Sequence, residues 1–552
     1  MALVEMELLQ RVVAVGALLG SLVVVWWIDR PNGRWGHSLR TRFVLGVPWG
    51  SIIVIGFVLS VYLFLQQGYW HWHRPVRLPY AAWSIFSPLG MVTAGVSHAS
   101  AGHLIGNMVS AAVLLPLAEY AFGHFPRERG NQSFSSWKTN PLVRAFVLFP
   151  AVVLFVALLT AVFSWGPVIG FSGVVFAAAG FALVRYPIAT VVALLGREVV
   201  LLIYRALQNP VLEQEATTQF VTPGWAGIAV QGHALGLFLG VAAGILLFYR
   251  FSDSNDPPSA IRLWFAALLA GMALSLWALW WVRGGDTYLL FRALGLAFVA
   301  IVAVLVVAPI TVSDQPVVRQ KGDRLTRRQI ATLAFLIPLI VMSMIAVPLN
   351  FNVVNDTGLP EDGSQVEVGE YTIAYATDVS DQMINVVDVS VFGETTQVET
   401  SGVIVASERR NIWSRQVSPR QLAHNGRATV VVGGPGWREA VVATREGWST
   451  TGGPAVYQIR LGKQGEPRQL AFESEPAQAG PVLAGYNVSI ASIDGEFYVE
   501  LSRNGSTVDR VLLPEAGDSV VAGGITFDRD DRALIAEIGD TSIQIAQKEQ
   551  YN

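Results

Sequence analysis

The chain has 552 residues, of which 52% are hydrophobic and only 14% are charged, and its mean hydropathy is +0.45. A soluble domain carries about 25% charged residues, so this composition excludes a wholly soluble protein and indicates an integral membrane protein. The sequence has no cysteine, which excludes disulfides, cysteine metal ligands and thiol nucleophiles.

Ten apolar segments predict membrane-spanning helices, for which about 20 consecutive residues suffice. In chain order they are 8–28, 43–66, 101–121, 142–163, 169–185, 188–206, 229–249, 261–282, 287–309 and 329–348. We interpret the first as a retained helix and not as a signal peptide. Glu5 and Glu7 stand where a signal peptide has basic residues, and no cleavage site follows.

Basic residues gather in alternate loops between these segments. Membrane proteins keep such loops in the cytoplasm, so we expect a multi-pass plasma-membrane protein with both termini outside. The residues are Arg30, Arg34, Arg40, Arg42, Arg127, Arg129, Lys138, Arg250, Arg262, Arg319, Lys321, Arg324, Arg327 and Arg328.

After Pro348 the pattern changes to short segments in which apolar and polar residues alternate, separated by Gly, Asn and Asp. This pattern predicts an all-β domain, expected outside the cell over residues 349–552. The segments are 369–375, 385–391, 428–432, 497–501, 525–527 and 542–546. From Asn350 onward there are 28 acidic and 15 basic residues, and the whole chain has four lysines. This composition suggests a halophilic source, although a GC-rich genome gives the same preference for Arg.

Polar residues begin three of the apolar helices, where they are costly and therefore functional candidates. His103, Asn107, Ser172 and His233 all lie in the first turns of their helices. At 1.5 Å per residue they lie at most about 10 Å below the outer ends of those helices. Three distant parts of the chain thus place a hydroxyl, two imidazoles and an amide at one depth.

Serine becomes a nucleophile when a base accepts its proton, and neutral histidine is the usual base near pH 7. These three segments contain no Asp or Glu at that depth, so the simplest chemistry is a dyad of Ser172 and His233. The oxyanion needs hydrogen-bond donors, which His103, Asn107 and the backbone N–H of Ser172 can supply.

Each feature also has a simpler interpretation. Gly170-x-Ser172-Gly173 is short enough to occur by chance, and a single membrane histidine more often packs or hydrogen-bonds. Gly232, Gly236 and Gly240 can serve helix packing alone. His98 and His103 are five residues apart without a nearby carboxylate, so we expect no metal and no cofactor.

Taken together, these residues resemble the rhomboid family of intramembrane serine proteases. The resemblance rests on His98-x4-His103-x3-Asn107, Gly170-x-Ser172-Gly173 and Gly232-His233 followed by Gly236 and Gly240, with Glu119 and Gly123 in the second core helix. It implies a polytopic α-helical membrane protein with a six-helix rhomboid core. The expected parts are an extra N-terminal helix and loop (1–42), the core (43–250), three extra helices (251–348) and an acidic extracytoplasmic β domain (349–552).

The resemblance also implies roles for individual residues. Ser172 would be the nucleophile, His233 the general base, and His103 and Asn107 the oxyanion donors. His98, Gly170, Gly173 and Glu119 would be structural. The helix at 188–206 would be a lateral gate, and residues 67–100 would form a membrane-embedded loop.

The implied substrates are single-pass membrane proteins, cleaved within the bilayer near its outer face, with no nucleic-acid partner. One departure is that many relatives carry Trp-Arg in the embedded loop, where this chain has Pro88-Leu-Gly90. Another is Arg197-Glu198 in the middle of the gate helix, which we interpret first as a buried pair or a face toward water, and second as functional.

Two alternatives have different functions. A catalytically silent rhomboid-like protein would bind membrane proteins or act in quality control, although such relatives typically lack the Ser or the His. A transporter would fit ten helices, but it predicts internal repeats and ion pairs at the midplane. For the β domain the sequence allows capture of substrate ectodomains, contact with the cell surface layer, or simple solubilisation.

Overall fold

The computed structural model describes residues 2–29, 37–125, 131–211, 218–250, 257–284, 286–317, 325–355, 357–360, 365–386, 390–391, 394–395 and 397–552. It divides into a helical unit (Met1–Thr217, Pro223–Val282 and Tyr288–Val353) and a β unit (Thr218–Thr222, Arg283–Thr287 and Val354–Asn552). Among the basic loop residues used to predict orientation, several lie outside the described residues: Arg30, Arg34, Arg127, Arg129, Arg319, Lys321 and Arg324.

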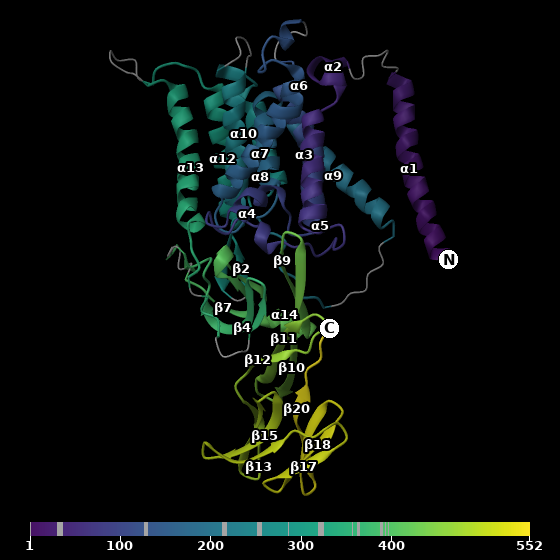
Figure 1. Ribbon diagram of the computed structural model, residues 1–552, viewed down its shortest axis with the longest axis vertical. Coiled ribbons are helices and arrows are strands. Elements are labelled where there is room, and N and C mark those ends of the chain that lie inside the picture. The colour runs from purple at the N-terminus through teal and green to yellow at the C-terminus, as the bar shows by residue number, and fades with distance from the viewer. Residues whose placement is uncertain are drawn as a thin grey trace. The chain divides into compact units, whose positions relative to one another are not determined.

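The described part of the helical unit contains a helix in each of the ten predicted segments (Figure 1). Within the described residues, seven helical stretches are long and apolar enough to cross a membrane, and three apolar helices are shorter. The chain is therefore a polytopic helical membrane protein. The helices are α1 (Ala2–Asp29), α3 (Trp49–Ser60) continued by η2 (Val61–Leu65), α5 (Ala101–Phe122), α6 (Pro141–Val143) continued by η6 (Arg144–Leu148) and α7 (Phe149–Val162), α8 (Ser172–Arg185), α9 (Pro187–Gln208), α10 (Val230–Ile245) continued by η7 (Leu246–Arg250), α11 (Ala260–Ala273), α12 (Arg292–Thr311) and α13 (Arg327–Asn350).

The prediction of one helix over 261–282 is wrong in its second half, because α11 ends at Ala273. Ser275 has a left-handed backbone (φ 63°), and the N–H of Leu276 donates to the carbonyl of Gly271 at 2.9 Å. A bond that closes a ring of six residues in this way is typical of the Schellman motif, which ends helices. The hairpin of β1 (Trp280–Gly284) and β2 (Thr287–Leu290) follows, so the next helix begins at Arg292 and not at 287.

Helix α8 is the most enclosed helix of the unit, and it packs closely against α10. A Cβ added to Gly236 would overlap the carbonyl oxygen of Gly173, and one added to Gly240 would overlap that of Ala177. On the facing helix, a Cβ on Gly180 would overlap the carbonyl oxygen of Leu237. The two backbones therefore touch without intervening side chains, which holds the start of α8 against the start of α10.

The segment between α3 and α5 folds into short helices that are buried in the helical unit: η3 (Leu78–Tyr80), α4 (Pro88–Thr93) and η4 (Ala94–Val96). Gln66 holds its two ends together, because its amide donates to the carbonyls of Val76 (2.9 Å) and His98 (2.8 Å) and accepts from the N–H of His98 (2.8 Å). Trp83 also anchors this loop, with its indole N–H donating to Leu78 at 2.6 Å. The loop is thus fixed without the Trp-Arg pair of many relatives.

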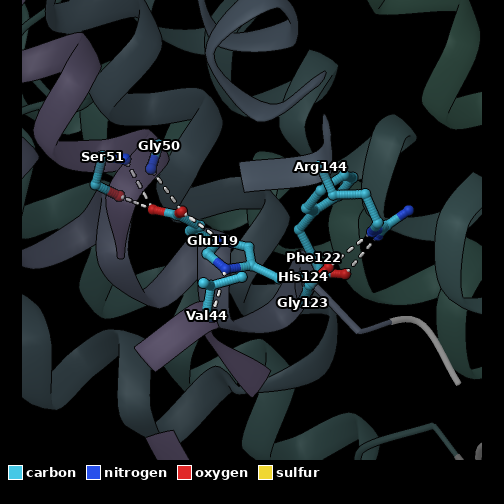
Figure 2. Close-up of polar contacts among 8 residues, drawn as sticks. All are labelled: Val44, Gly50, Ser51, Glu119, Phe122, Gly123, His124 and Arg144. Carbon is cyan, nitrogen blue, oxygen red and sulfur yellow. Dashed lines mark hydrogen bonds and ion pairs between the residues drawn. The ribbon is translucent and has the colours of Figure 1, made fainter. Parts of the chain in front are cut away.

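A buried polar cluster joins α3 to the end of α5 that is farther from His103 and Asn107 (Figure 2). The carboxylate of Glu119 accepts from the N–H groups of Gly50 and Ser51, both at 2.8 Å, and from the Ser51 hydroxyl at 2.6 Å. Since Nδ1 of His124 accepts from the N–H of Val44 (3.0 Å), its Nε2 carries the proton and donates to Glu119 (2.6 Å). A neutral histidine therefore satisfies this buried carboxylate.

The described part of the β unit consists of antiparallel sheets with a short α-helix, α14 (Pro419–Asn425), and a 3-10 turn, η8 (Glu408–Arg410), which confirms the expected all-β region. The sheet orders are β12-β11-β10-β20-β19-β18-β17 with β9 on β10, then β13-β14-β15-β16, β3-β4-β7-β8 and β5-β6. The strands are β3 (Val366–Val368), β4 (Tyr371–Ser380), β5 (Ser390–Val391), β6 (Glu394–Thr395), β7 (Glu399–Ser407), β8 (Ile412–Val417), β9 (Arg427–Gly434), β10 (Trp437–Thr450), β11 (Ala455–Lys463), β12 (Gln469–Glu473), β13 (Ala477–Leu483), β14 (Tyr486–Ile493), β15 (Glu496–Arg503), β16 (Ser506–Leu512), β17 (Ser519–Ala522), β18 (Ile525–Asp530), β19 (Ala533–Ile538) and β20 (Thr541–Lys548).

Strand β10 runs between two parts of the β unit, pairing with β9 and β11 over most of its length and with β20 at Trp448–Thr450. Trp448 packs there in a core with side chains of β14, β15, β18 and β20, among them Ile490 and Phe527. The strand predicted over 385–391 is wrong in its first part. Asn385 and Val386 lie in a turn, 387–389 lie outside the described residues, and only 390–391 form a strand.

Candidate active site

The starts of α5, α8 and α10 meet around one cavity of about 520 Å³ in the helical unit. Ser172 is the first residue of α8, His233 the fourth of α10, and His103 and Asn107 the third and seventh of α5. All four side chains line this cavity, as do Gly170, Gly173 and Gly232. The volume is in the range of small-ligand pockets.

Ser172 and His233 are hydrogen-bonded, with 2.9 Å between Oγ and Nε2. Close packing of α8 on α10 brings them together, because Gly236, one turn after His233, contacts the backbone of Gly173. The His233 ring stacks on Phe176 with centroids 4.3 Å apart and planes 17° from parallel. Since Phe176 lies one turn after Ser172 on α8, the same helix carries the hydroxyl and the surface on which the imidazole rests.

Hydrogen-bond donors surround the position next to the Ser172 hydroxyl. The Asn107 amide nitrogen is buried and has no partner among the described residues. The first N–H groups of α8 have no acceptor within the helix, and the helix dipole adds partial positive charge at this end. The geometry therefore offers an anionic oxygen several donors.

Gly170 brings His103 close to the start of α8. Its φ of +139° lies in a region that favours glycine, and an added Cβ would lie 2.6 Å from Cε1 of the His103 ring. A side chain here would push the imidazole out of the cavity. Gly173 is equally confined, because an added Cβ would lie 2.8 Å from the Thr160 side chain of α7.

The remaining candidates lie beside the cavity or away from it. His98 is fully buried behind His103, with ring centroids 5.2 Å apart, and its two ring nitrogens have no partner in the described part of the chain. Gly236 and Gly240 serve the packing of α10 on α8. Glu119 lies in the buried cluster of Figure 2 and does not line the cavity.

Helix α13, from the C-terminal extension, holds the loop that leads to Ser172. The buried Asn350 amide donates to the carbonyls of Val162 and Ser164, the latter at 3.0 Å. The backbone carbonyl of Asn350 accepts from the N–H of Ile85, in the loop between α3 and α5, at 2.8 Å. Asn350 was not predicted from the sequence. Its only signal in the sequence is an amide side chain at the end of an apolar helix.

A second contact of α13 reaches the start of α10. The carbonyl of Met342 accepts from the Trp165 indole at 3.0 Å and from the Gln231 amide at 3.4 Å. The same Gln231 amide accepts from the Trp165 N–H at 3.0 Å and donates to Phe163 at 2.9 Å. Gln231 precedes His233 by two residues, so these bonds connect both halves of the Ser–His pair to the extension.

The cavity walls carry no acidic side chain among the described residues. In the same part of the chain no group of three or more His, Cys, Asp or Glu side chains is arranged to hold a metal ion. The charged side chain that does line the cavity is Arg197, from the middle of α9. The arrangement is therefore a hydroxyl, an imidazole and neutral donors, with one cation at the edge.

Comparison with known proteins agrees with this arrangement. Residues 81–250 match the family model of the Rhomboid domain, and they include the cavity-lining residues of α5, α8 and α10. Comparison with curated proteins and with solved structures finds no match. Residues 81–250 of this chain are therefore identified as a Rhomboid domain, the domain whose motifs the sequence resembles.

Proposed function

We propose that the protein is an intramembrane serine endopeptidase in which Ser172 is the nucleophile and His233 the general base. The observation that carries this proposal is the 2.9 Å separation of Ser172 Oγ and His233 Nε2 within a polar cavity of a helical membrane unit. A hydroxyl at hydrogen-bond distance from an imidazole is the minimal arrangement for nucleophilic catalysis by serine.

The reaction has two halves. As Ser172 Oγ attacks the substrate carbonyl carbon, its proton passes to Nε2 of His233, and the carbonyl oxygen becomes an oxyanion. His233 then gives this proton to the amide nitrogen of the breaking C–N bond, so the new amino end departs and an ester to Ser172 remains. A water molecule, losing a proton to His233, attacks the ester, and the proton returns to Ser172 as the acid product leaves.

The oxyanion would be bound by the Asn107 amide, the His103 ring and the backbone N–H of Ser172. The partnerless Asn107 nitrogen supports this role, because a buried donor without an acceptor costs about 1–3 kcal/mol in the free protein. An oxyanion that forms only during the reaction would satisfy that donor, which favours the transition state over the ground state.

The substrate would be a single-pass membrane protein cleaved near the outer face of the plasma membrane. A peptide bond inside a hydrogen-bonded helix is shielded, so the substrate must unwind at the cleavage position. The four polar residues lie within the first seven residues of their helices, which is at most about 10 Å from the helix ends. The outward direction of these ends rests on the distribution of basic loop residues, which also predicts both termini outside.

The test is cleavage of a single-pass reporter by the full-length protein in liposomes. We expect cleavage within or just outside the reporter's membrane segment, and a complete loss of it in Ser172→Ala. Ser60→Ala is the matched control, because Ser60 does not line the cavity and its hydroxyl donates to the carbonyl of Gly56 in its own helix. Cleavage by Ser172→Ala at the wild-type rate would overturn Ser172 as the nucleophile. No cleavage by the wild type on any reporter would overturn the protease assignment and favour a silent binding protein.

A further inference from the structure

Arg197 is an unusual residue for its position in the chain. It lies near the middle of α9, a 22-residue helix that exposes Glu198, Arg205 and Gln208 together with six large apolar side chains: Ile188, Val192, Leu195, Val199, Val200 and Leu202. An arginine at the centre of a membrane helix costs about 2.5–3.5 kcal/mol on insertion scales. Such a residue is therefore retained for a contact that an apolar residue cannot make.

The Arg197 side chain lines the same cavity as Ser172 and His233, and 21% of it is exposed. Its Nη1 donates to Glu198 at 2.7 Å, but the Glu198 side chain is 62% exposed, so this pair is not buried. Our first interpretation of Arg197-Glu198 was a buried pair or a face toward water, and the exposure of Glu198 excludes the buried pair. The Nε of Arg197 is buried and has no hydrogen-bond partner among the described residues.

Arg445 of the β unit shows what such a guanidinium can bind. Its Nε and Nη2 hold the two carboxylate oxygens of Glu549 at 2.8 Å and 2.6 Å. In Arg197, Nη1 donates to Glu198. Its Nε, which corresponds to one of the two donors that Arg445 uses for Glu549, has no acceptor among the described residues. A carboxylate entering the cavity would complete the same geometry, which is the strongest that arginine makes.

We propose that Arg197 determines specificity by binding an acidic side chain of the substrate close to the cleaved bond. This inference rests on the proposed protease function and names its substrate class: single-pass membrane proteins with an Asp or Glu near the outer end of the membrane segment. An acidic residue in a membrane helix is itself costly, so pairing with Arg197 lowers the free energy of both charges. Glu198 occupies Nη1 of Arg197, and none of the described residues that line the cavity is an Asp or Glu that would occupy Nε.

The experiment uses the full-length protein in liposomes with paired single-pass reporters. The cleaved bond of a neutral parent reporter is mapped first, and Asp or Asn is then placed at each of the neighbouring positions. We expect wild-type kcat/KM to favour Asp over Asn by about tenfold at one or two positions. Arg197→Gln should bring this ratio close to one, and Arg197→Lys, which keeps the charge without the fork, should give an intermediate ratio.

Two further variants separate specificity from folding. Arg197→Glu should reverse the preference, so that a reporter with Lys at the same position is cleaved faster than one with Asp. Arg205→Gln is the matched control and should leave the Asp/Asn ratio unchanged, because Arg205 lies on the same helix but does not line the cavity. An Asp/Asn ratio near one in the wild type at every position, or a ratio that Arg197→Gln does not alter, would overturn the Arg197 proposal alone. Wild-type protein that cleaves no reporter would overturn the protease assignment as well.

Discussion

Nε2 of His233 lies 2.9 Å from Oγ of Ser172, although 61 residues separate them in the chain. The contact depends on the small residues of α8 and α10, since any side chain at Gly236 would meet the backbone of Gly173. Two residues that act as one unit give mutational effects that do not add. Ser172→Ala and His233→Ala should each lower kcat/KM by roughly 10³-fold or more, and the double variant should be no slower than the worse single variant. If the losses of the two single variants added in the double variant, this would contradict a step that Ser172 and His233 share.

Asn107 should act on the chemical step and not on substrate binding. Asn107→Ala removes a donor that has no other partner among the described residues. We expect kcat to fall about 10²–10³-fold with KM nearly unchanged, because the oxyanion exists only in the transition state. Steady-state kinetics of reporter cleavage measure kcat and KM separately. A rise in KM at constant kcat would instead place Asn107 in ground-state binding.

The α8–α10 contact should not tolerate a methyl group. Gly240→Ala places a Cβ on the carbonyl oxygen of Ala177, so the helices must separate. We expect a loss of about 1–3 kcal/mol in stability and a parallel loss of activity as Ser172 and His233 move apart. Gly56→Ala on α3 is the control, because a Cβ there has nothing within 4 Å. Thermal unfolding in detergent should distinguish the two, and equal unfolding temperatures would argue against close packing.

Asn350 should link the C-terminal extension to the active site. Asn350→Leu leaves the carbonyls of Val162 and Ser164 without this donor, which costs about 1–3 kcal/mol if they stay buried. We expect lower thermal stability and lower kcat, because the loop that precedes Ser172 loosens. Ser343→Ala is the control on the same helix, since its hydroxyl donates only to Leu339 of α13. Wild-type kcat in Asn350→Leu would mean that the loop needs no such support.

The β unit should show a pH dependence from Asp381. Burial raises the pKa of this carboxyl, against the opposing effect of hydrogen bonds from the N–H groups of Met383 and Ile384 and of the charge of Arg415. The folded state therefore favours the protonated carboxyl of Asp381. The stability that this preference adds is present at low pH, and it is lost as the pH rises through the raised pKa of the folded state.

Asp381→Asn keeps the acceptor oxygen without the charge. It should flatten the dependence of unfolding temperature on pH above about 4, and it should not lower stability at pH 7. Asp381→Leu removes the acceptor and should destabilise the unit at every pH. Calorimetry across this range is the measurement, and an unfolding temperature in Asp381→Asn that falls as steeply with pH as in the wild type would contradict the account.

The sequence predicted the helices well because long apolar runs are specific to membrane spans. It failed at 274–290, where Trp277 to Trp281 are as apolar as a helix but follow a left-handed Ser275 and enter a hairpin. Hydropathy does not distinguish an apolar strand from the end of an apolar helix. Likewise, the strand at 385–391 has an alternating pattern, but Asp381 turns the chain by accepting from two following N–H groups.

In the candidate site, short motifs led to the residues that line the cavity, because the three motifs begin three helices at one depth. The supports of the site could not be predicted from motifs. Asn350 meets Ser164 across 186 residues, and Gln66 meets His98 across 32, with no periodicity to mark either pair. Phe176 had a weak signal as an aromatic residue one turn after Ser172, and Arg197 had a clear one as a charge inside an apolar helix.

The most direct test of the central claim is labelling of the full-length protein in liposomes with a fluorophosphonate, followed by mapping of the modified peptide. The account predicts one adduct, on Ser172, that is absent in Ser172→Ala and strongly reduced in His233→Ala, whereas Ser60→Ala, outside the cavity, labels like the wild type. An adduct on another serine, equal labelling of Ser172→Ala, or no labelling of wild-type protein would contradict Ser172 as an activated nucleophile.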